Sequence, residues 1–597
     1  MIIRLLGPAI LLITGAAMLW WSWGTWPDPQ VDFGRELYVA WRLSEGEALY
    51  RDIAHVMGPL SPYLNALWFH LFGASLLTLV LCNLAILAGL TALSYQLLAD
   101  LSSEFAATIA CVVLLMVFAF GQFVEIGNYN FICPYRHELT HGLTLSLAAL
   151  VCLSAYLKYQ QLPAIAGVGS CIGLLSLTKI EVFLAAVLAI AAGLGLAVWA
   201  ERPARRRLAG LLMCLTASAV VPPLLAFLLL LPRLSPAAAL QGILGMWLPV
   251  ATFATSPFYR VGMGLDNLRG NLAVMLNWTG WYALLFGSSA GVSFLLRAAG
   301  KFRFWFMGAF SSVVALMLGN VGAGNVDFWL GAVRPLPLVM GIAAVWCWVG
   351  LQRQRGNLQS ARRMIMALAT VLFASGLLGK ILLNARVYHY GFALAMPATL
   401  LLVVALVEWI PQGLSRRGGD GLIFRAVALT VLAIAVTAHL QMVGRWFGRK
   451  RYVVAHGPDV FRSDVRGALL GRALEAIAQH VKPQQALLVL PEGLMLNYLS
   501  RRASPNPYGE LMPTELAFFG EDQVLAAIQA NPPDYVVLVH KDTSEYGAQF
   551  FGRDYGRRIS TWVQDHYGEV ALIGDPPFQH PRHFGIALMR RVVPGPS

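Results

Sequence analysis

The sequence predicts a polytopic α-helical membrane protein with a C-terminal α/β domain outside the cytoplasm. Of its 597 residues, 57% are hydrophobic and only 13% are charged, and the mean hydropathy is +0.62. Soluble proteins carry about 25% charged residues, so this composition indicates a chain whose main solvent is lipid. The charges also fall between apolar stretches of about 20 residues, the length that crosses a bilayer.

These apolar stretches predict about 13 transmembrane helices. An odd number, with the N-terminus in the cytoplasm, places the C-terminal tail outside it. We therefore expect a transmembrane domain over residues 1–443, with a first periplasmic loop at 27–75, and an extracytoplasmic domain over 444–597. The predicted spans lie near residues 5–26, 76–98, 105–121, 139–157, 163–178, 182–199, 208–231, 276–296, 304–320, 334–351, 364–380, 391–410 and 423–443.

The net charge of +13 fixes orientation and does not indicate a nucleic-acid partner. Basic clusters lie in four short loops, all on the cytoplasmic side of the predicted topology, as the positive-inside rule requires. The clusters are at residues 202–207, 297–303, 353–363 and 416–425. We expect a multi-pass protein of the bacterial inner membrane.

The tryptophans near the end of the first span bear on its fate, and the cysteines bear on disulfides and metal sites. Trp20, Trp21, Trp23 and Trp26 resemble an interfacial aromatic belt, which predicts a retained helix rather than a cleaved signal peptide. The seven cysteines form no C-x-x-C pair, so neither a disulfide framework nor a cysteine zinc site is supported.

The first outer loop contains candidate acid–base residues. Asp28 and Pro29 predict a helix start, and Asp32 and Glu36 then lie one turn apart on one face. Such a carboxylate at the membrane surface suits a general base for a hydroxyl. The alternative is a solvated face offset by Arg35 and other basic residues. A second juxtamembrane helix is expected after Pro59.

A second candidate site is His137-Glu138-Leu139-Thr140-His141, an H-E-x-x-H match where the chain re-enters the membrane. On a helix, two such histidines can hold zinc while the glutamate activates water. Catalytic zinc needs three protein ligands, and no third-ligand motif follows. A metal-free helix end and a polar substrate pocket are the other interpretations.

Several cations on the outer side break the positive-inside pattern. Lys179 and Glu181 lie in a tight turn between two spans, where charges are costly and a functional role is the default. A lysine there can hold a phosphate at headgroup level. Arg334, Lys380 and Arg386 also lie on the outer side, the last two near His389 and Tyr390 in the sequence. Either an anionic ligand or snorkelling from a helix end would explain each of these cations.

The tail has the pattern of a small α/β domain. Short apolar runs predict strands at residues 486–490, 535–539, 570–573 and 584–589, with a helical stretch at 515–529. It contains no Gly-rich phosphate loop, nucleophile elbow or metal cluster. We expect a recognition domain or structural cap.

Taken together, these patterns resemble the GT-C glycosyltransferases, in particular the bacterial protein O-mannosyltransferase and aminoarabinose-transferase type. The resemblance covers the architecture of the whole chain. It rests on D-F-G-R-E-L-Y with G-E-A-L-Y-R-D, G-P-L-S-P-Y-L-N-A-L-W-F-H-L-F-G, P-Y-R-H-E-L-T-H-G, L-T-K-I-E-V-F-L, Y-H-Y-G-F and, in the tail, L-P-E-G-L-M-L-N-Y-L.

The resemblance implies transfer of a sugar from a polyprenyl-phosphate carrier to a lipid, polysaccharide or protein acceptor, with inversion and no required cofactor. Asp32 would be the general base. Glu36 would orient the acceptor or would itself be the base in place of Asp32. The family's adjacent Asp-Glu is absent, because Phe33 follows Asp32. Donor phosphate would bind Lys179, Arg334, Lys380 and Arg386. Substrate would bind Tyr63, Tyr135, His137, Glu138, His141, Glu181, His389 and Tyr390.

Two other functions compete with the transferase. One is a zinc-dependent membrane protease, in which His137 and His141 would hold a divalent metal. The other is a non-enzymatic transporter or flippase. Transporters usually show internal repeats and mid-membrane binding groups, whereas no repeat is evident here and the polar groups lie near one face.

Overall fold

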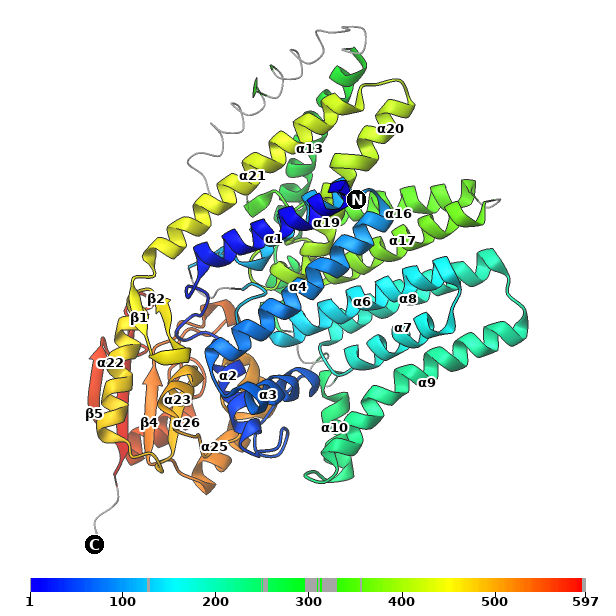
Figure 1. Ribbon diagram of the computed structural model, residues 1–597. Helices are drawn as coiled ribbons and strands as arrows, with labels where there is room; N and C mark the ends of the chain where they lie inside the picture. Colours follow the sequence, from blue (N-terminus) through cyan, green and yellow to red (C-terminus); the bar gives the residue numbers. More distant parts are fainter. Residues whose placement is uncertain are drawn as a thin grey trace.

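The computed structural model describes residues 2–125, 129–247, 250, 256–295, 309, 312–313, 330–354 and 357–592. Long helices form the body of the protein, and a smaller domain of strands and helices lies at one end of it (Figure 1). In the described part, nine helices are long and apolar enough to cross a membrane. The helical body and the strand-containing C-terminal domain confirm the predicted fold class, a polytopic α-helical protein with a C-terminal α/β domain.

The nine candidate spans agree with predicted spans to within several residues. They are Leu5–Ser22, Leu76–Leu101, His137–Tyr159, Ile180–Glu201, Arg205–Leu230, Leu336–Arg353, Leu358–Ile381, Gly391–Arg416 and Gly421–Arg449. Two further predicted spans are shorter apolar helices, Glu104–Ala119 and Leu162–Leu175. The span predicted at 276–296 lies in a 28-residue helix, and most of the one at 304–320 lies outside the described residues.

The elements of the helical body follow in chain order. They are α1 (Ile2–Ser22), α2 (Phe33–Ser44), α3 (Leu60–Phe72), α4 (Leu76–Leu101), α5 (Glu104–Val113), η1 (Leu114–Ala119), α6 (His137–Tyr159), α7 (Leu162–Leu175), α8 (Ile180–Glu201), α9 (Arg205–Leu230), α10 (Pro236–Leu244), η2 (Gly245–Trp247), α12 (Pro257–Met263), α13 (Leu268–Leu295), α16 (Leu336–Arg353), α17 (Leu358–Leu378), η4 (Gly379–Ile381), α18 (Gly391–Leu394), α19 (Met396–Val404), η5 (Ala405–Trp409), α20 (Ile410–Arg416) and α21 (Gly421–Arg449).

Two details of the N-terminal region differ from expectation. The first helix ends at Ser22, and Trp26 is buried, so it is not part of an interfacial belt, whereas Trp20 is 84% exposed. The helix of the first loop begins at Phe33 and not at Pro29. The Asp28 carboxylate accepts hydrogen bonds from the backbone of Gln30 and Val31 instead. The second expected helix is α3, which follows Pro59.

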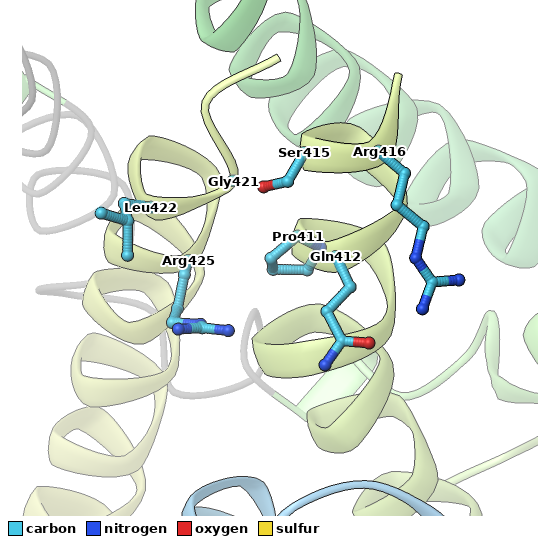
Figure 2. Close-up of a pocket in the computed structure, with 7 residues that line it drawn as sticks. All are labelled: Pro411, Gln412, Ser415, Arg416, Gly421, Leu422 and Arg425. Atoms are coloured by element: carbon cyan, nitrogen blue, oxygen red, sulfur yellow. The ribbon is translucent and has the colours of Figure 1, made fainter. Parts of the chain in front are cut away.

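The C-terminal domain begins directly after α21, whose junction with α20 is tight (Figure 2). Its elements are β1 (Tyr452–Val454), η6 (Gly457–Asp459), β2 (Phe461–Ser463), α22 (Val465–His480), β3 (Leu487–Leu490), α23 (Leu494–Ser500), α24 (Pro513–Phe519), α25 (Glu521–Ala530), β4 (Tyr535–Val539), η7 (Ser544–Tyr546), α26 (Arg557–His566), β5 (Tyr567–Gly574) and β6 (Gly585–Arg591).

The main sheet of this domain has the strand order β3-β4-β6-β5. The β3–β4 pair is parallel, and the other two pairs are antiparallel. All four strands coincide with the predicted ones within a few residues, because buried strands read as continuous apolar runs. The predicted helix at 515–529 is two helices, α24 and α25, since Gly520 between them has a φ of +84° that breaks the helical path.

The C-terminal domain packs closely on the first loop. Gly34 of α2 lies so near α23 that a Cβ atom there would be 2.0 Å from the backbone nitrogen of Met495. The Gln30 side chain donates to the carbonyl of His540, and Arg466 forms a 2.8 Å ion pair with Asp28. These contacts fix the start of α2 against the tail.

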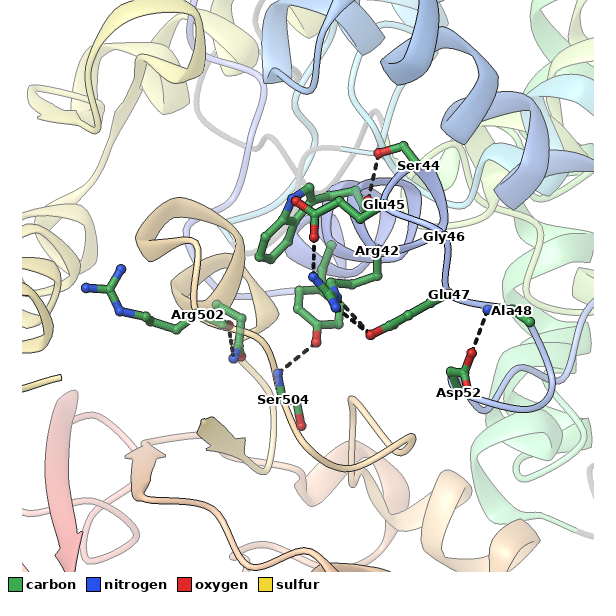
Figure 3. A network of polar contacts seen from close by, with 12 residues as sticks. Arg42, Ser44, Glu45, Gly46, Glu47, Ala48, Asp52, Arg502 and Ser504 are labelled. Atoms are coloured by element: carbon green, nitrogen blue, oxygen red, sulfur yellow. Dashed lines mark hydrogen bonds and ion pairs between the residues drawn. The ribbon is translucent and has the colours of Figure 1, made fainter. Parts of the chain in front are cut away.

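A polar network holds the other end of α2 and the following turn (Figure 3). The Arg42 guanidinium pairs with Glu45 and with Glu47, which is 2.6 Å away. The Tyr38 hydroxyl accepts a hydrogen bond from the backbone N–H of Ser504 in the C-terminal domain. These contacts hold the first loop against the C-terminal domain, so the loop is not a free, solvated segment.

Replacing Gly34 by Ala is expected to destabilise the docking of the C-terminal domain. The added Cβ meets backbone, which cannot rotate away, so we expect a loss of about 1–3 kcal/mol. Thermal unfolding in detergent and protection of the tail from trypsin measure it. The control is Gly89→Ala in α4, where a Cβ meets nothing within 4 Å. Equal stability of the two variants would contradict the packing described.

Candidate functional site

The site is built around Asp32, the residue before α2. Its backbone adopts a φ of 56°, an uncommon conformation for any residue but glycine, and its side chain does not cap the helix. Its N–H donates to the Glu492 carboxylate at 3.0 Å. Its carboxylate pairs instead with Arg136 at 3.1 Å. Arg136, just before α6, also has a positive φ, 44°. Two unusual backbone conformations thus bring one ion pair together, a pattern common at functional sites.

Two more ion pairs adjoin this one. Glu492 pairs with Lys541 at 2.7 Å, and Glu510 pairs with Arg35 at 3.3 Å. All four of these side chains are at least 85% buried. Buried charges are costly unless they are paired, so the three pairs hold the first loop, α6 and the C-terminal domain together.

One carboxylate oxygen from each of Asp32, Glu492 and Glu510 lies within 4.8 Å of the others, a spacing that can hold a metal ion. Among the described residues this is the only group of three such ligands that meets that spacing. Each carboxylate, however, already has a cationic partner: Arg136, Lys541 and Arg35 respectively. A divalent ion would have to compete with these three cations, so the donor set fits a metal poorly.

Burial raises the pKa of two carboxyl groups in this region. Burial and the nearby Glu138 raise the pKa of Glu36 to about 7, although Arg35 opposes the shift. Burial likewise raises the pKa of Glu510 to about 8. Glu36 touches Arg35 at 3.4 Å and is 6% exposed. Glu36 therefore lies one helical turn from Asp32, as predicted, but its side chain is buried.

A cation cluster forms the second part of the site. The Glu181 carboxylate accepts a hydrogen bond from Lys380 at 2.6 Å and forms an ion pair with Lys179 at 3.3 Å. Both ammonium groups also lie over the Tyr390 ring, 4.3 and 4.5 Å from its centroid. One carboxylate shared by two lysines leaves a net charge of +1, which suits an anionic ligand.

Tyr390 connects the two parts. Its ring stacks on Tyr135 at 6.2 Å, and Tyr135 in turn contacts Phe33. The Tyr135 hydroxyl is buried and has no hydrogen-bond partner among the described residues. The predicted residues Asp32, Lys179, Glu181, Lys380, Tyr135 and Tyr390 are thus brought together.

His389 joins this aromatic wall. Its ring lies 4.1 Å from the Tyr390 ring and 5.0 Å from the Tyr129 ring. Burial, reinforced by Arg386 and Lys380, lowers the pKa of His389 well below its usual value. Its imidazole is therefore a neutral member of the wall.

The H-E-x-x-H residues form the first turn of α6, as expected, but the histidines make other bonds. Both ring nitrogens of His137 contact amide nitrogens, of Asn65 at 2.7 Å and of Asn83 at 3.0 Å. His141 Nδ1 bonds the Ser61 hydroxyl at 2.9 Å. With both of its nitrogens occupied, His137 has none left for a metal, so the described residues do not favour the zinc-protease alternative.

Three other predicted residues have partners away from the centre. Arg334 donates to the carbonyl of Leu383 at 3.0 Å. Arg386 donates to the carbonyl of Gly262 at 3.1 Å. The Tyr63 hydroxyl accepts from the N–H of Leu49. The two arginines fasten loops, because among the described residues their hydrogen bonds go to backbone carbonyls or to Asn271.

A cavity of about 50 Å³ lies beside the ion pairs, between the first loop and the C-terminal domain. Arg35, Arg136 and Glu510 line it, together with His55. His55 Nε2 lies 3.7 Å from the Glu138 carboxylate. Burial lowers the pKa of His55 to about 4.

Several residues of the site were not anticipated from the sequence: His55, Arg136, Glu492, Glu510 and Lys541. Arg136 and Glu492 stand in motifs quoted above, P-Y-R-H-E and L-P-E-G, but no spacing rule singles them out. Glu510 and Lys541 carry no local signal, because the partner of Glu510 is hundreds of residues away and that of Lys541 lies outside its own helix or turn.

Comparisons with known proteins give matches among solved structures only. No family model matches the chain, and no curated protein matches it. The Archaeoglobus fulgidus oligosaccharyltransferase in complex with Zn and sulfate is 15% identical over 97% of this chain and 73% of that one, with a TM-score of 0.46. ArnT from Cupriavidus metallidurans bound to undecaprenyl phosphate is 14% identical over 99% of both chains, with a TM-score of 0.45.

Both neighbours are GT-C glycosyltransferases, the type that the sequence motifs resemble. The likeness extends along nearly all of this chain. With TM-scores below 0.5, it assigns no role to any residue here, and the chemistry of the site has to be argued from its own geometry.

The raised pKa of Glu510 predicts a pH-dependent stability. Between the unfolded pKa of about 4.3 and the folded pKa of about 8, the unfolded chain has released a proton that the folded chain keeps. Stability should therefore fall as pH rises through this window, by up to about 1.4 kcal/mol per pH unit. Glu510→Gln should flatten the decline, measured as thermal unfolding from pH 5 to pH 8.5.

The control for this comparison is Glu45→Gln, which removes a 49% exposed carboxylate from the end of the neighbouring helix. The expected result is a slope close to that of the wild type. If Glu510→Gln declined as steeply as the wild type, Glu510 would not be the group that links folding to protonation.

Proposed function

We propose that this chain is an integral membrane glycosyltransferase that moves a sugar from a polyprenyl-phosphate carrier to a hydroxyl acceptor, with inversion. The observation that supports this most strongly is the pairing of a carboxylate and a surplus cation around one residue, Tyr390. The ammonium groups of Lys179 and Lys380 lie over the Tyr390 ring. The Tyr390 ring stacks on Tyr135, which contacts Phe33, the residue after Asp32. Such a transfer needs a base for the acceptor and a cation for the leaving phosphate.

The location suits a lipid-linked donor. Arg136 precedes α6, Lys179 precedes α8 and Lys380 follows α17, so all three stand at ends of candidate spans. Side chains at span ends lie at the depth of lipid headgroups. In the predicted topology this is the extracytoplasmic face of the bacterial inner membrane, where the C-terminal domain also lies.

Asp32 is the proposed general base. Arg136 holds its Oδ1 at 3.1 Å and orients the carboxylate, which leaves Oδ2 for the acceptor. As the acceptor oxygen attacks the anomeric carbon, its proton passes to Asp32. The bond between the anomeric carbon and the phosphate oxygen breaks at the same time, and its electron pair goes to the phosphate.

The cation cluster is the proposed phosphate site. Among the described residues, Glu181 is the one ion-pair partner of both Lys179 and Lys380, so an arriving phosphate meets a net positive charge. As the sugar leaves, negative charge grows on the phosphate oxygen, and these ammonium groups stabilise it. Arg386 and Arg334, which are held by backbone carbonyls, add to the positive potential without direct contact.

The aromatic wall is the proposed sugar site, and the cavity beside His55 is the proposed entry of the acceptor. The buried Tyr135 hydroxyl has no hydrogen-bond partner among the described residues, and the Tyr390 ring lies under both ammonium groups. Glu36, with its raised pKa, can hold a proton at neutral pH and donate a hydrogen bond. The proposed reaction uses no metal, because Lys179 and Lys380 supply the positive charge for the leaving phosphate.

Replacing Asp32 by Asn is expected to lower turnover by about 10²–10⁴-fold, the contribution of a general base. Asn keeps the shape of the side chain but cannot accept the proton. The assay supplies radiolabelled polyprenyl-phosphate sugars to protein purified in detergent. Binding of polyprenyl phosphate should remain close to that of the wild type, because the lysines are untouched.

The matched control is Asp266→Asn, an exposed acid that no contact ties to the site. It should retain full activity. If Asp32→Asn turned over at the wild-type rate, the assignment of the base would be wrong. Failure of the wild type to use any polyprenyl-phosphate sugar would overturn the proposed function itself.

Replacing Lys380 by Met is expected to reduce kcat/KM by about 100-fold, because the leaving phosphate loses a charge partner. Glu181→Gln should do the opposite to binding and tighten the complex with polyprenyl phosphate, since it raises the charge of the cluster by one. Lys158→Met, an exposed lysine paired with Asp100 at the far end of α6, is the control. Unchanged kcat/KM in Lys380→Met would contradict the phosphate site.

A further inference from the structure

A second polar pocket lies at the junction of α20 and α21, far from the site described above (Figure 2). Its volume is about 300 Å³, and it is partly open to the outside. Pro411, Gln412, Ser415, Arg416, Gly421, Leu422 and Arg425 line it. The pocket therefore combines two arginines with neutral polar and apolar side chains.

The shape of this pocket depends on a close approach of the two helices. A Cβ atom at Gly421 would lie 2.4 Å from the carbonyl oxygen of Pro411 and 2.5 Å from the Ser415 hydroxyl oxygen. Only glycine permits this contact. The helices diverge from it, and the side chains of Gln412 and Arg425 extend into the space between them (Figure 2).

The pocket has unused hydrogen-bond donors. Arg425 donates from Nε to the carbonyl of Val407 and from Nη2 to Glu408, at 2.7 and 3.1 Å. Its Nη1 makes no such bond in the described residues. Arg416 likewise has no ion-pair partner in the part of the chain that the structure describes. Glu408 balances one of the two arginines, which leaves a net charge of +1.

The position of the pocket indicates what kind of anion can reach it. Two candidate spans meet here, Gly391–Arg416 and Gly421–Arg449, so the pocket lies where the chain leaves and re-enters the membrane. The 29 residues of α21 separate it from the C-terminal domain by about 43 Å. It is therefore at the opposite face, the predicted cytoplasmic one, and cannot belong to the transfer site.

We propose that this pocket binds the headgroup of an anionic phospholipid of the cytoplasmic leaflet. The phosphate accepts hydrogen bonds from Arg416 and Arg425, and Gln412 and Ser415 contact the remainder of the headgroup. Leu422, 48% exposed at the rim, gives the start of the acyl chains an apolar surface. Basic pockets between transmembrane helices on this side are sites where anionic headgroups bind. The proposal is independent of the transferase function.

The test compares binding of palmitoyl-oleoyl phosphatidylglycerol to wild type and variants by native mass spectrometry in detergent. Arg416→Gln and Arg425→Gln should each weaken binding by about fivefold, the effect of one cation near a lipid phosphate. Arg417→Gln is the matched control: it removes the same charge from the same loop, but Arg417 does not line the pocket. It should bind the lipid as the wild type does.

Two outcomes would overturn the proposal. If Arg417→Gln weakened binding as much as Arg416→Gln, net charge and not a pocket would hold the lipid. If inorganic phosphate at millimolar concentration displaced the lipid, the pocket would be a site for free anions. Arg416 is exposed and its replacement does not disturb the core, so a folding defect of Arg425→Gln would leave the comparison of residues 416 and 417 decisive.

Discussion

A cluster of buried carboxyl groups and cations at the start of α2 is the constraint on which the rest of the site depends. Asp32, Glu492 and Glu510 bring one oxygen each to within 4.8 Å of the others. An unpaired charge in such a place costs several kcal/mol. The cations that offset them come from three parts of the chain: Arg35 in α2, Arg136 before α6 and Lys541 in the C-terminal domain. Forming the pairs and assembling the site are therefore one event.

The balance of charges also determines the arrangement of the cation cluster. Lys179 and Lys380 come from the ends of different helices and converge on Glu181. A second carboxylate would cancel their charge, and none would leave two ammonium groups repelling each other. One shared carboxylate holds both lysines in place, while Tyr390 offers its ring face to each of them. The cluster is thus ordered before any ligand arrives and still retains an excess of positive charge.

Local patterns in the sequence predicted the parts of this protein that depend on local physics. Apolar stretches marked the spans and the buried strands, and charges on the outer side marked Asp32, Lys179 and Lys380. The start of α2 was misplaced, because Asp28 satisfies the backbone of its own turn and Arg466 of the tail, which the sequence alone does not connect to it. His137 was placed in a substrate pocket or a metal site, yet Asn65 and Asn83 occupy both of its ring nitrogens. Glu510 and Lys541 could not be found at all, since their partners lie more than 40 residues away in sequence and no motif marks them.

The dependence of the first loop on the tail has a consequence for biosynthesis. A ribosome makes the chain from its N-terminus, so in the predicted topology Asp32 is among the first residues to leave the cytoplasm. Glu492, which accepts the hydrogen bond of the Asp32 N–H, and Lys541, which neutralises Glu492, are made only after the last helix. Until the tail has crossed the membrane and folded, the loop has no surface to dock on. The first loop therefore reaches the arrangement described above only after the tail has been synthesised and has folded against it.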